Sequence, residues 1–302
     1  MTMRVATFPL SEQMINSALR TQSVMVTDQL EEASGVSAQD YGDLGATSKQ
    51  VINLQISVSR SEAYSTAAAA ADSRTQVMYS AVTSISNLLT QFRSTLTAAS
   101  NTANTNSTTV TQTAQQLMSE MGSLLNTQYG GEYLFGGSNT TTPPVNVSSS
   151  AYPPVSASTP STSYYQGNDE AASVRVSETQ TVTYGVTADN TAFEQGLRAL
   201  NLVANNSPLS TANLTAALNL TVSAVSATSA VQAQLGLSSS SMQTASATQS
   251  DYQTYAKSLS DNLTGVDVAA VTAQLSSYQA QLEASYSAIA KIQGLSLSSY
   301  LH

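Results

Sequence analysis

Over much of the chain, apolar and small residues recur at alternating intervals of three and four positions. No other feature of the sequence constrains the fold as strongly. Residues at that spacing lie on one face of an α-helix and form the seam along which coiled-coil helices pack. The pattern therefore predicts long helices that lie side by side. Its clearest runs are Ala71, Thr75, Met78, Val82, Ile85, Leu89, Phe92, Leu96 and Ala99; Val110, Ala114, Leu117, Met121 and Leu124; and Leu214, Ala217, Thr221, Ala224, Thr228, Val231, Leu235, Ser238, Met242, Ala245, Gln249, Tyr252, Ala256, Leu259 and Leu263.

The third run is the longest and predicts one continuous helix. Roughly 50 residues at 1.5 Å per residue give a helix about 75 Å long. Gly236 lies inside this run, and it costs about 1 kcal/mol relative to alanine, which a long packed helix can absorb. Residues 100–109, between the first two runs, are rich in Asn, Thr and Ser and predict the turn of a helical hairpin.

Both ends of the chain carry apolar stripes at helical spacing, and Gly294 is the expected stop of the last helix. Such stripes need a partner, which is either the other terminal helix or another subunit. Of these alternatives we favour subunit contact. The predicted subunit-interface residues are Ile15, Leu19, Val26, Leu30, Val268, Val271, Leu275, Tyr278, Leu282, Ile289, Ile292, Leu295, Leu297, Tyr300 and Leu301.

Residues 130–190 depart from the helical pattern. The aromatic segment 133–135 is bounded by glycine pairs, and the proline pairs at 143–144 and 153–154 are incompatible with helix. From Val174 the apolar residues alternate with polar ones, as in a β-strand, and the helical spacing returns at Phe193.

The predicted fold is therefore mainly α: a long coiled-coil-like helical rod with paired N- and C-terminal helices and one small β-rich insert domain. We expect residues 1–40 and 264–302 to form the terminal helices. Residues 41–137 and 191–263 would form the helical rod, and residues 138–190 a β-rich outer domain.

Composition excludes most catalytic chemistry. The 302 residues include no Cys and one His, His302, which removes thiolate chemistry, His-based triads and multi-His metal sites. Ser and Thr number 49 and 37, whereas charged residues are only 10% of the chain. A net charge of −9 with ten Lys and Arg argues against nucleic-acid binding. We expect no enzyme activity, no cofactor and no metal.

Three short segments have weak chemical signals. The acidic segment 40–43 lacks the ligand spacing of a calcium loop, so we expect a turn between helices. The acidic pair at 169–170 is expected in a solvated turn rather than in acid–base catalysis. Tyr164 and Tyr165 suit either a carbohydrate-stacking surface or packing in the insert, and packing is the preferred interpretation.

Targeting signals are also sparse. The first ten residues carry one Arg but no apolar core behind it, so we expect no cleaved secretory signal. The uncharged stretches are rich in Ser, Thr and Asn, and we expect no membrane insertion.

Several segments resemble bacterial flagellin-family proteins. The C-terminal segments 263–271 and 294–301 look like the end of family members, and 232–236 resembles the Leu-Gly step in their last long helix. Residues 165–169 and 174–177, followed by Phe193, resemble the family's β domain. The segment Tyr133-Leu134-Phe135-Gly136-Gly137, with Thr142-Pro143-Pro144-Val145 behind it, is more like the hook–filament junction branch, hook-associated protein 3.

One segment departs from the family pattern. Members usually show Ser/Thr-Gly and a basic residue near position 34, followed by a pair of Asp residues. Here residues 31–36 contain no basic residue, and Asp40-Tyr41-Gly42-Asp43 replaces the Asp pair.

The resemblance implies an extracellular structural subunit of the bacterial flagellum, exported unfolded through the flagellar type III channel without a cleaved signal. It implies that the terminal helices pair as the inner layer of a helical assembly. The implied partners are copies of the chain, hook-associated protein 1, flagellin and an export chaperone. The alternatives are filament flagellin, a flagellin-like cell-surface binding protein or adhesin, and a chemoreceptor signalling bundle.

Overall fold

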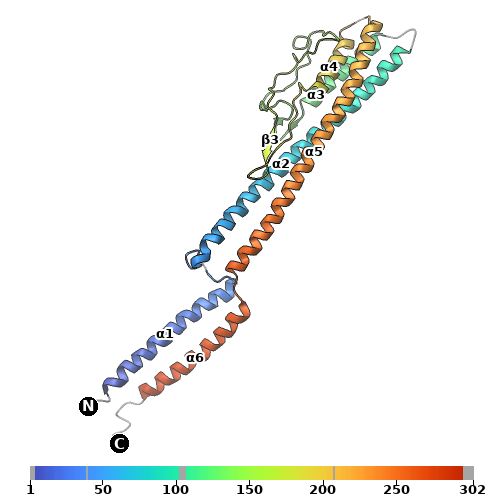
Figure 1. Ribbon diagram of the computed structural model, residues 1–302. Coiled ribbons are helices and arrows are strands. Elements are labelled where there is room, and N and C mark those ends of the chain that lie inside the picture. Colours follow the sequence, from blue (N-terminus) through green and yellow to red (C-terminus); the bar gives the residue numbers. More distant parts are fainter. Residues whose placement is uncertain (1–3, 39, 102–106, 207, 295–302) are drawn as a thin grey trace. The chain divides into compact units, whose positions relative to one another are not determined.

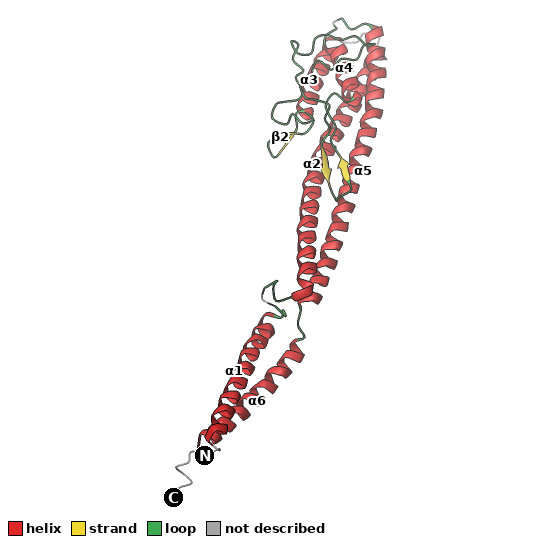
Figure 2. Ribbon diagram, turned by 60° about the vertical axis from the view of Figure 1, so that its left-hand side comes forward, coloured by secondary structure: helices red, strands yellow, loops and turns green. Residues whose placement is uncertain are grey.

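The structure is a computed structural model that describes residues 4–38, 40–101, 107–206 and 208–294 (Figure 1). Six α-helices account for most of these residues (Figure 2). The segment of the chain that joins the third helix to the fourth contains two small two-stranded sheets. The helices are α1 (Arg4–Ser34), α2 (Ser48–Ser100), α3 (Ser107–Leu125), α4 (Thr191–Ala204), α5 (Thr211–Thr264) and α6 (Val268–Gly294), with a short 3₁₀ turn, η1 (Gly45–Thr47), before α2. The predicted mainly α fold with a small β-rich insert is confirmed.

The chain forms two compact units. The first contains Met1–Ser59 and Gln253–His302, and the second contains Arg60–Tyr252. Helices α2 and α5 each contribute residues to both units, as their bounds show. Each unit is described by itself below.

The core of the second unit lies along the predicted seams. Every residue of the first run is buried, from Ala71 to Ala99. In the second run Val110 to Met121 are buried, whereas Leu124 is half-buried and Leu125 takes its place in the core. From Met78 onward these apolar residues belong to one continuous cluster shared by α2, α3, α4 and α5, whereas Ala71 packs in a second, smaller cluster with Val176, Val182 and Tyr184 of the insert.

The third run follows the prediction over most of its length. Its members from Leu214 to Met242 are buried, and Ala245 and Gln249 are half-buried. Tyr252 was predicted on the same seam, but it is 41% exposed and the prediction is wrong there. Close to this position the Ser61 hydroxyl donates to the main-chain carbonyl of Gln249 at 3.0 Å, so a small residue brings α2 near the α5 backbone and leaves little room for a tyrosine ring.

Hydroxyl and amide side chains fix how α2 and α5 lie against each other. Ser61 Oγ donates to Gln249 Oε1 at 2.8 Å, and the hydroxyls of Ser65 and Ser246 are 2.9 Å apart. Further along, Gln232 Nε2 donates to the Thr83 hydroxyl at 3.0 Å. A shift of one helical turn would break all of these contacts together, so they specify the pairing register of the two helices.

Helix α4 packs closely against α2 and α3 because of a glycine. A Cβ built on Gly196 would lie 3.0 Å from Met121 Cε and 3.1 Å from Leu89 Cδ2. Beside it, the rings of Phe135 and Phe193 meet edge to face, with centroids 5.9 Å apart. Phe135 precedes the insert in the chain, so this contact attaches the start of the insert to the helical core.

The two sheets are short hairpins. Strand β1 (Gln128–Tyr129) pairs antiparallel with β2 (Glu132–Tyr133), and the turn glycines Gly130 and Gly131 have φ of 60° and 85°. Positive φ at both central residues is the conformation of a type I′ turn. Strand β3 (Ser173–Arg175) pairs antiparallel with β4 (Thr181–Thr183), with Val174 opposite Val182.

Among the described helices, α5 alone is long and apolar enough to cross a membrane by length and composition. Core helices of soluble proteins pass the same test. One face of α5 is buried in the apolar cluster of the second unit, and 33% of the apolar window is buried.

Replacing Phe193 with alanine tests the core of the second unit. Phe193 is fully buried, and we expect Phe193→Ala to lower the free energy of unfolding by about 3–5 kcal/mol. Tyr129→Ala is the control because Tyr129 is 38% exposed, and it should change the stability by no more than about 0.5 kcal/mol. Urea unfolding followed by circular dichroism measures both. Equal losses in the two variants would contradict this placement of the core.

Candidate assembly interface

In the first unit, α1 and α6 pack along each other (Figure 1). The buried residues of α6 are Val271, Leu275 and Leu282, whereas Ala18 is the only buried residue among the described side chains of α1. The other residues on the same face of α1 are half-buried and small, flexible or polar: Ser11, Met14, Thr21, Met25 and Asp28.

The predicted stripe of α1 lies on a different face. Ile15, Leu19, Val26 and Leu30 are 39%, 56%, 48% and 51% exposed. Val24, which was not among the predicted residues, is also exposed. Four large apolar side chains of one helix therefore contact solvent along a single face, and α6 does not cover them.

The predicted residues of α6 divide between the two environments. Val271, Leu275 and Leu282 are buried, and Val268 is exposed. Tyr278, Ile289 and Ile292 are half-buried. The predicted tail residues Leu295, Leu297, Tyr300 and Leu301 lie outside the described residues.

The contact between α1 and α6 buries few apolar side chains and is partly polar. Thr272 Oγ1 donates to Glu32 Oε1 at 2.8 Å. One carboxylate oxygen of Asp28, Oδ2, is buried and has no hydrogen-bond partner among the described residues. A buried polar atom without a partner lowers stability, so the α6-facing side of α1 includes an unfavourable polar group, whereas the larger aliphatic side chains of α1 are exposed.

Hydrogen bonds between two connecting segments hold α1 and α6 together. One segment joins α1 to α2, and the other joins α5 to α6. Ser37 N–H donates to the carbonyl of Thr264 at 2.7 Å, and Val266 N–H donates to the carbonyl of Gly35 at 3.1 Å. Gly35 has φ 71°, which favours glycine. Asp267 caps α6, as its carboxylate accepts from Ala269 N–H at 3.0 Å.

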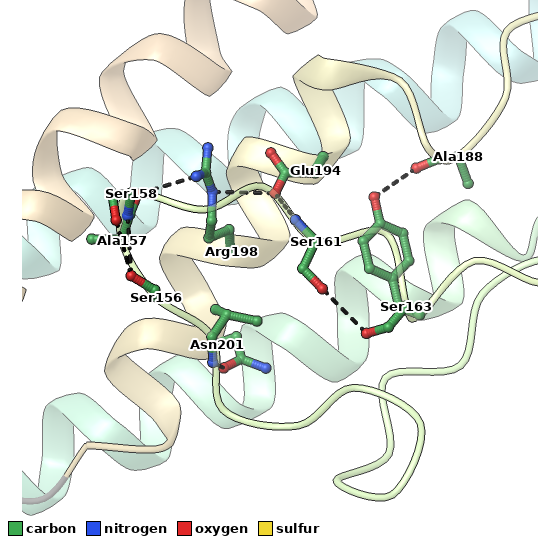
Figure 3. A network of polar contacts seen from close by, with 11 residues as sticks. Ser156, Ala157, Ser158, Ser161, Ser163, Ala188, Glu194, Arg198 and Asn201 are labelled. Atoms are coloured by element: carbon green, nitrogen blue, oxygen red, sulfur yellow. Dashed lines mark hydrogen bonds and ion pairs between the residues drawn. The ribbon is translucent and has the colours of Figure 1, made fainter.

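A buried polar network holds the insert on α4 (Figure 3). Glu194 and Arg198, 3% and 6% exposed, form an ion pair at 3.2 Å. Glu194 Oε1 also accepts from Ser161 N–H at 2.9 Å, and Arg198 Nη1 donates to the carbonyl of Ala157 at 3.1 Å. The two charged side chains therefore bind the main chain of the insert as well as each other.

Asn201 extends this network by two helical turns. Its Oδ1 accepts from Val155 N–H at 3.2 Å, and its Nδ2 donates to the carbonyl of Tyr152 at 3.3 Å. Glu194, Arg198 and Asn201 lie at i, i+4 and i+7 and so share one face of α4. The i, i+4 spacing of Glu194 and Arg198 is the signal in the sequence that indicates this network.

Two tyrosines of the insert are fully buried beside this network. Tyr152 and Tyr164 meet edge to face, with centroids 5.1 Å apart. Tyr164 donates its hydroxyl to the carbonyl of Ala188 at 3.0 Å, whereas the Tyr152 hydroxyl has no partner among the described residues. Burial raises the pKa of both phenols well above the ordinary value, with a smaller contribution from the negative charge of Glu194.

Tyr165 is half-buried, and its hydroxyl donates to the carbonyl of Asn168 at 2.6 Å. Desolvation is the main cause of its raised pKa, followed by the carboxylates of Asp189 and Asp169. Tyr164 and Tyr165 thus pack within the insert, as preferred above, and do not form an exposed stacking surface.

The segments with weak chemical signals form turns. Residues 40–43 form a turn in which Asp43 N–H donates to the carbonyl of Asp40 at 3.0 Å. Asp169 and Glu170 are exposed. No cluster of three or more His, Cys, Asp or Glu side chains suited to a metal ion occurs among the described residues.

Comparisons with known proteins define the class of protein. Residues 5–140 match the family model of the bacterial flagellin N-terminal helical region, and residues 218–301 match that of the bacterial flagellin C-terminal helical region. The chain belongs to the bacterial flagellin family. It is therefore a structural subunit of the bacterial flagellum, an extracellular assembly, and it associates with copies of itself and with other flagellar axial proteins. It is not an enzyme.

Solved structures share the fold at low sequence identity. A putative flagellar hook-associated protein from Vibrio parahaemolyticus is 19% identical with a TM-score of 0.61, covering 72% of this chain and 97% of its own. Flagellar hook associated protein-3 from Legionella pneumophila is 14% identical with a TM-score of 0.58, covering 70% of this chain and 98% of its own. A search of curated proteins finds no match.

The buried ion pair gives a prediction for the insert. Glu194→Gln keeps an acceptor for Ser161 N–H but leaves Arg198 without a counter-charge, which should lower the free energy of unfolding by about 3–5 kcal/mol. Replacing both charges, Glu194→Leu with Arg198→Met, should recover part of that loss. Urea unfolding of the two variants and the wild type measures this. Equal stability of wild type and Glu194→Gln would contradict the network.

The buried tyrosines give a second prediction. Their pKa is higher in the folded state than in the unfolded state, so the unfolded chain loses protons first as the pH rises above about 10. The contribution of each tyrosine to stability should therefore be constant below pH 10 and fall above it by about 1.4 kcal/mol per pH unit.

Tyr152→Phe and Tyr164→Phe should each reduce that alkaline loss. At pH 7 Tyr164→Phe should cost about 1 kcal/mol, because it removes a hydrogen bond, and Tyr152→Phe should cost nothing. Urea unfolding from pH 7 to 11 separates these effects. An alkaline slope that both variants leave unchanged would contradict the burial of the phenols.

Proposed function

We propose that this chain is the subunit that joins the hook to the filament of the flagellum. The observation that carries the proposal is the exposed apolar face of α1, which needs another subunit, together with the junction-like segment Tyr133–Gly137. The fold similarity to two solved structures named as hook-associated proteins supports the same branch of the family.

In this proposal, residues 1–40 and 264–302 form the inner layer of the assembly. The apolar side chains of α1 at 15, 19, 26 and 30, with Val268 and the half-buried apolar residues of α6, pack against neighbouring subunits. The buried apolar residues of α6 contribute indirectly, because they hold α6 against α1 and so orient the outward face. They are Val271, Leu275 and Leu282. The apolar side chains on the outward face of α1 are about half exposed, so covering each of them contributes about 1 kcal/mol of binding free energy.

The rest of the chain has a separate part in the proposal. Residues 41–137 and 191–263 form the helical rod outside that layer, and residues 138–190 form the outer domain. Because subunits in such an assembly contact each other head to tail, the array stays open and does not close into a dimer.

The proposed partners are copies of this chain, hook-associated protein 1 on one side and flagellin on the other. We further propose export through the flagellar type III channel without a cleaved signal peptide, with the help of an export chaperone. Filament flagellin is the alternative within the family.

A deletion strain tests the junction role. Cells without this chain should secrete flagellin subunits into the medium and carry hooks without filaments, as seen by electron microscopy and by immunoblotting of the culture supernatant. A deletion strain that keeps filaments of normal length would contradict the junction role.

Complementation of that strain tests the α1 face. Leu19→Asp places a charge on the outward face, where Leu19 is 56% exposed. The variant should stay helical and appear in the medium but restore few or no filaments, because burying an unpaired carboxylate costs several kcal/mol. Gln13→Asp adds the same charge at an exposed position off the stripe and should restore filaments. Equal filament numbers with both variants would remove α1 from the interface.

A further inference from the structure

One segment of α5 is composed of residues that form helices poorly. This serine segment, residues 236–241, contains the single glycine of α5, Gly236, and four consecutive serines. Glycine loses the most backbone freedom on folding, and serine can bond its own main chain in other conformations, so both rank below alanine as helix formers. Neighbouring Gly and Ser residues are also a common cause of kinks in helices. Without support from outside, α5 would therefore open at this segment.

The apolar core of the second unit is interrupted at the same level. On α5 the large apolar cluster ends at Leu235, and the smaller cluster begins at Met242. On α2 the smaller cluster ends at Ala71, and the large cluster begins at Met78. The buried residue of α5 between the two clusters is polar, namely Ser238. Apolar packing between α2 and α5 thus stops on one side of the serine segment and resumes on the other.

Polar contacts from outside α5 reach two of the four serines. Ser238 Oγ donates to the carbonyl of Thr183 in β4 at 3.0 Å. Ser239 Oγ donates to the carboxylate of Asp72 in α2. The hydroxyls of the other two serines, at 240 and 241, are exposed and have no hydrogen-bond partner among the described residues. The serine segment is therefore held by hairpin β3–β4 and by α2.

Hairpin β3–β4 also covers the start of the smaller cluster, directly after the serine segment. Val176 and Val182 of the hairpin belong to one apolar cluster with Met242 of α5. At the turn of the hairpin, Glu178 forms an ion pair with Arg60 of α2. The hairpin therefore bridges α2 and α5 beside the segment that their own apolar packing leaves out.

The hairpin and the serine segment depend on each other. An isolated two-stranded hairpin is marginally stable at best in water, so β3–β4 needs its contacts with the helices. The serine segment needs the hairpin in turn, for the hydrogen bond of Ser238 and for the burial of Met242. Parts of a protein that support each other in this way open together as one cooperative unit.

We propose that the serine segment is a hinge in α5 that the docked hairpin β3–β4 keeps closed. While the hairpin is docked, α5 is one continuous helix. When the hairpin leaves the helices, the serine segment loses its helical hydrogen bonds and α5 bends there. The inference concerns contacts within a single chain, so it holds whether the chain joins the hook to the filament or forms the filament itself.

Hydrogen exchange of the full chain, followed by mass spectrometry, tests the hinge. Local opening exposes main-chain N–H groups to exchange, so the protection of a segment, corrected for its intrinsic rates, reports how seldom it opens. In the wild type, the protection of residues 236–241 should be about tenfold lower than that of residues 224–235, which include buried residues of the large cluster. Equal protection of the two segments would overturn the proposal.

Two charge substitutions in the hairpin test its role. Val182 is 9% exposed, and Val182→Asp places a carboxylate in the smaller cluster, so the hairpin should undock. Thr181→Asp adds the same charge at the neighbouring exposed position and is the control. Val182→Asp should lower the protection of residues 236–241 by about a further tenfold and leave residues 224–235 unchanged, whereas Thr181→Asp should change neither. Loss of protection in both segments with Val182→Asp, or in neither, would overturn the proposal.

A stabilising variant tests the hinge without removing a contact. Ser240→Ala with Ser241→Ala replaces two hydroxyls that have no partner among the described residues. Because alanine is the better helix former, this change should raise the protection of residues 236–241 about fivefold, in the wild type and in Val182→Asp alike. Ser223→Ala, at an exposed position earlier in α5, should leave that segment unchanged. Unaltered protection in the alanine variant would mean that poor helix formers do not cause the opening, and would overturn the hinge.

Discussion

The close packing of α2 against α5 is the interaction on which the second unit depends. Their shared seam is built from Ala, Ser and Thr together with larger apolar residues such as Ile85, Leu89 and Phe92, and it is aligned by hydrogen bonds such as that between Ser61 and Gln249. Small residues bring helices close together but bury little area at each turn. The pair therefore gains stability through its length, and α3, α4 and the insert add further large side chains to the same core.

The pair of terminal helices represents the opposite arrangement. Helices α1 and α6 bury few apolar residues between them, and Asp28 and Glu32 lie on or beside the α6-facing side of α1. The larger apolar residues of α1 face outward. A helix whose inward face is the more polar one is poorly stabilised by the chain alone, and this suits a subunit that completes its core in an assembly. The flagellin-family membership gives that property a function.

The sequence predicted the helices well because the 3-4 spacing is long, and each further heptad adds evidence for the same face. The seam from Ala71 to Ala99 was predicted residue by residue. The prediction failed at Tyr252, because the spacing of residues along the sequence carries no information about the distance between two helices. The sequence also did not reveal which face of α1 is buried. The buried face carries Ala18 and Met25, whereas hydrophobicity favours the face that is exposed in the structure.

The insert was predictable only in outline. Proline pairs and alternating valines indicated non-helical structure, but the hydrogen bonds that hold it come from Glu194, Arg198 and Asn201 on a helix later in the chain. Contacts between a loop and a distant helix leave no periodic pattern. The interface residues at the C-terminal end, from Leu295 onward, remain a prediction.

The central claim is that this chain occupies one position in the flagellum, between hook and filament. Immunogold labelling of isolated flagella, with an antibody raised against the insert at residues 138–190, tests it most directly. The account predicts one band of gold particles where the filament meets the hook. Gold along the whole filament, or none on the flagellum, would contradict it.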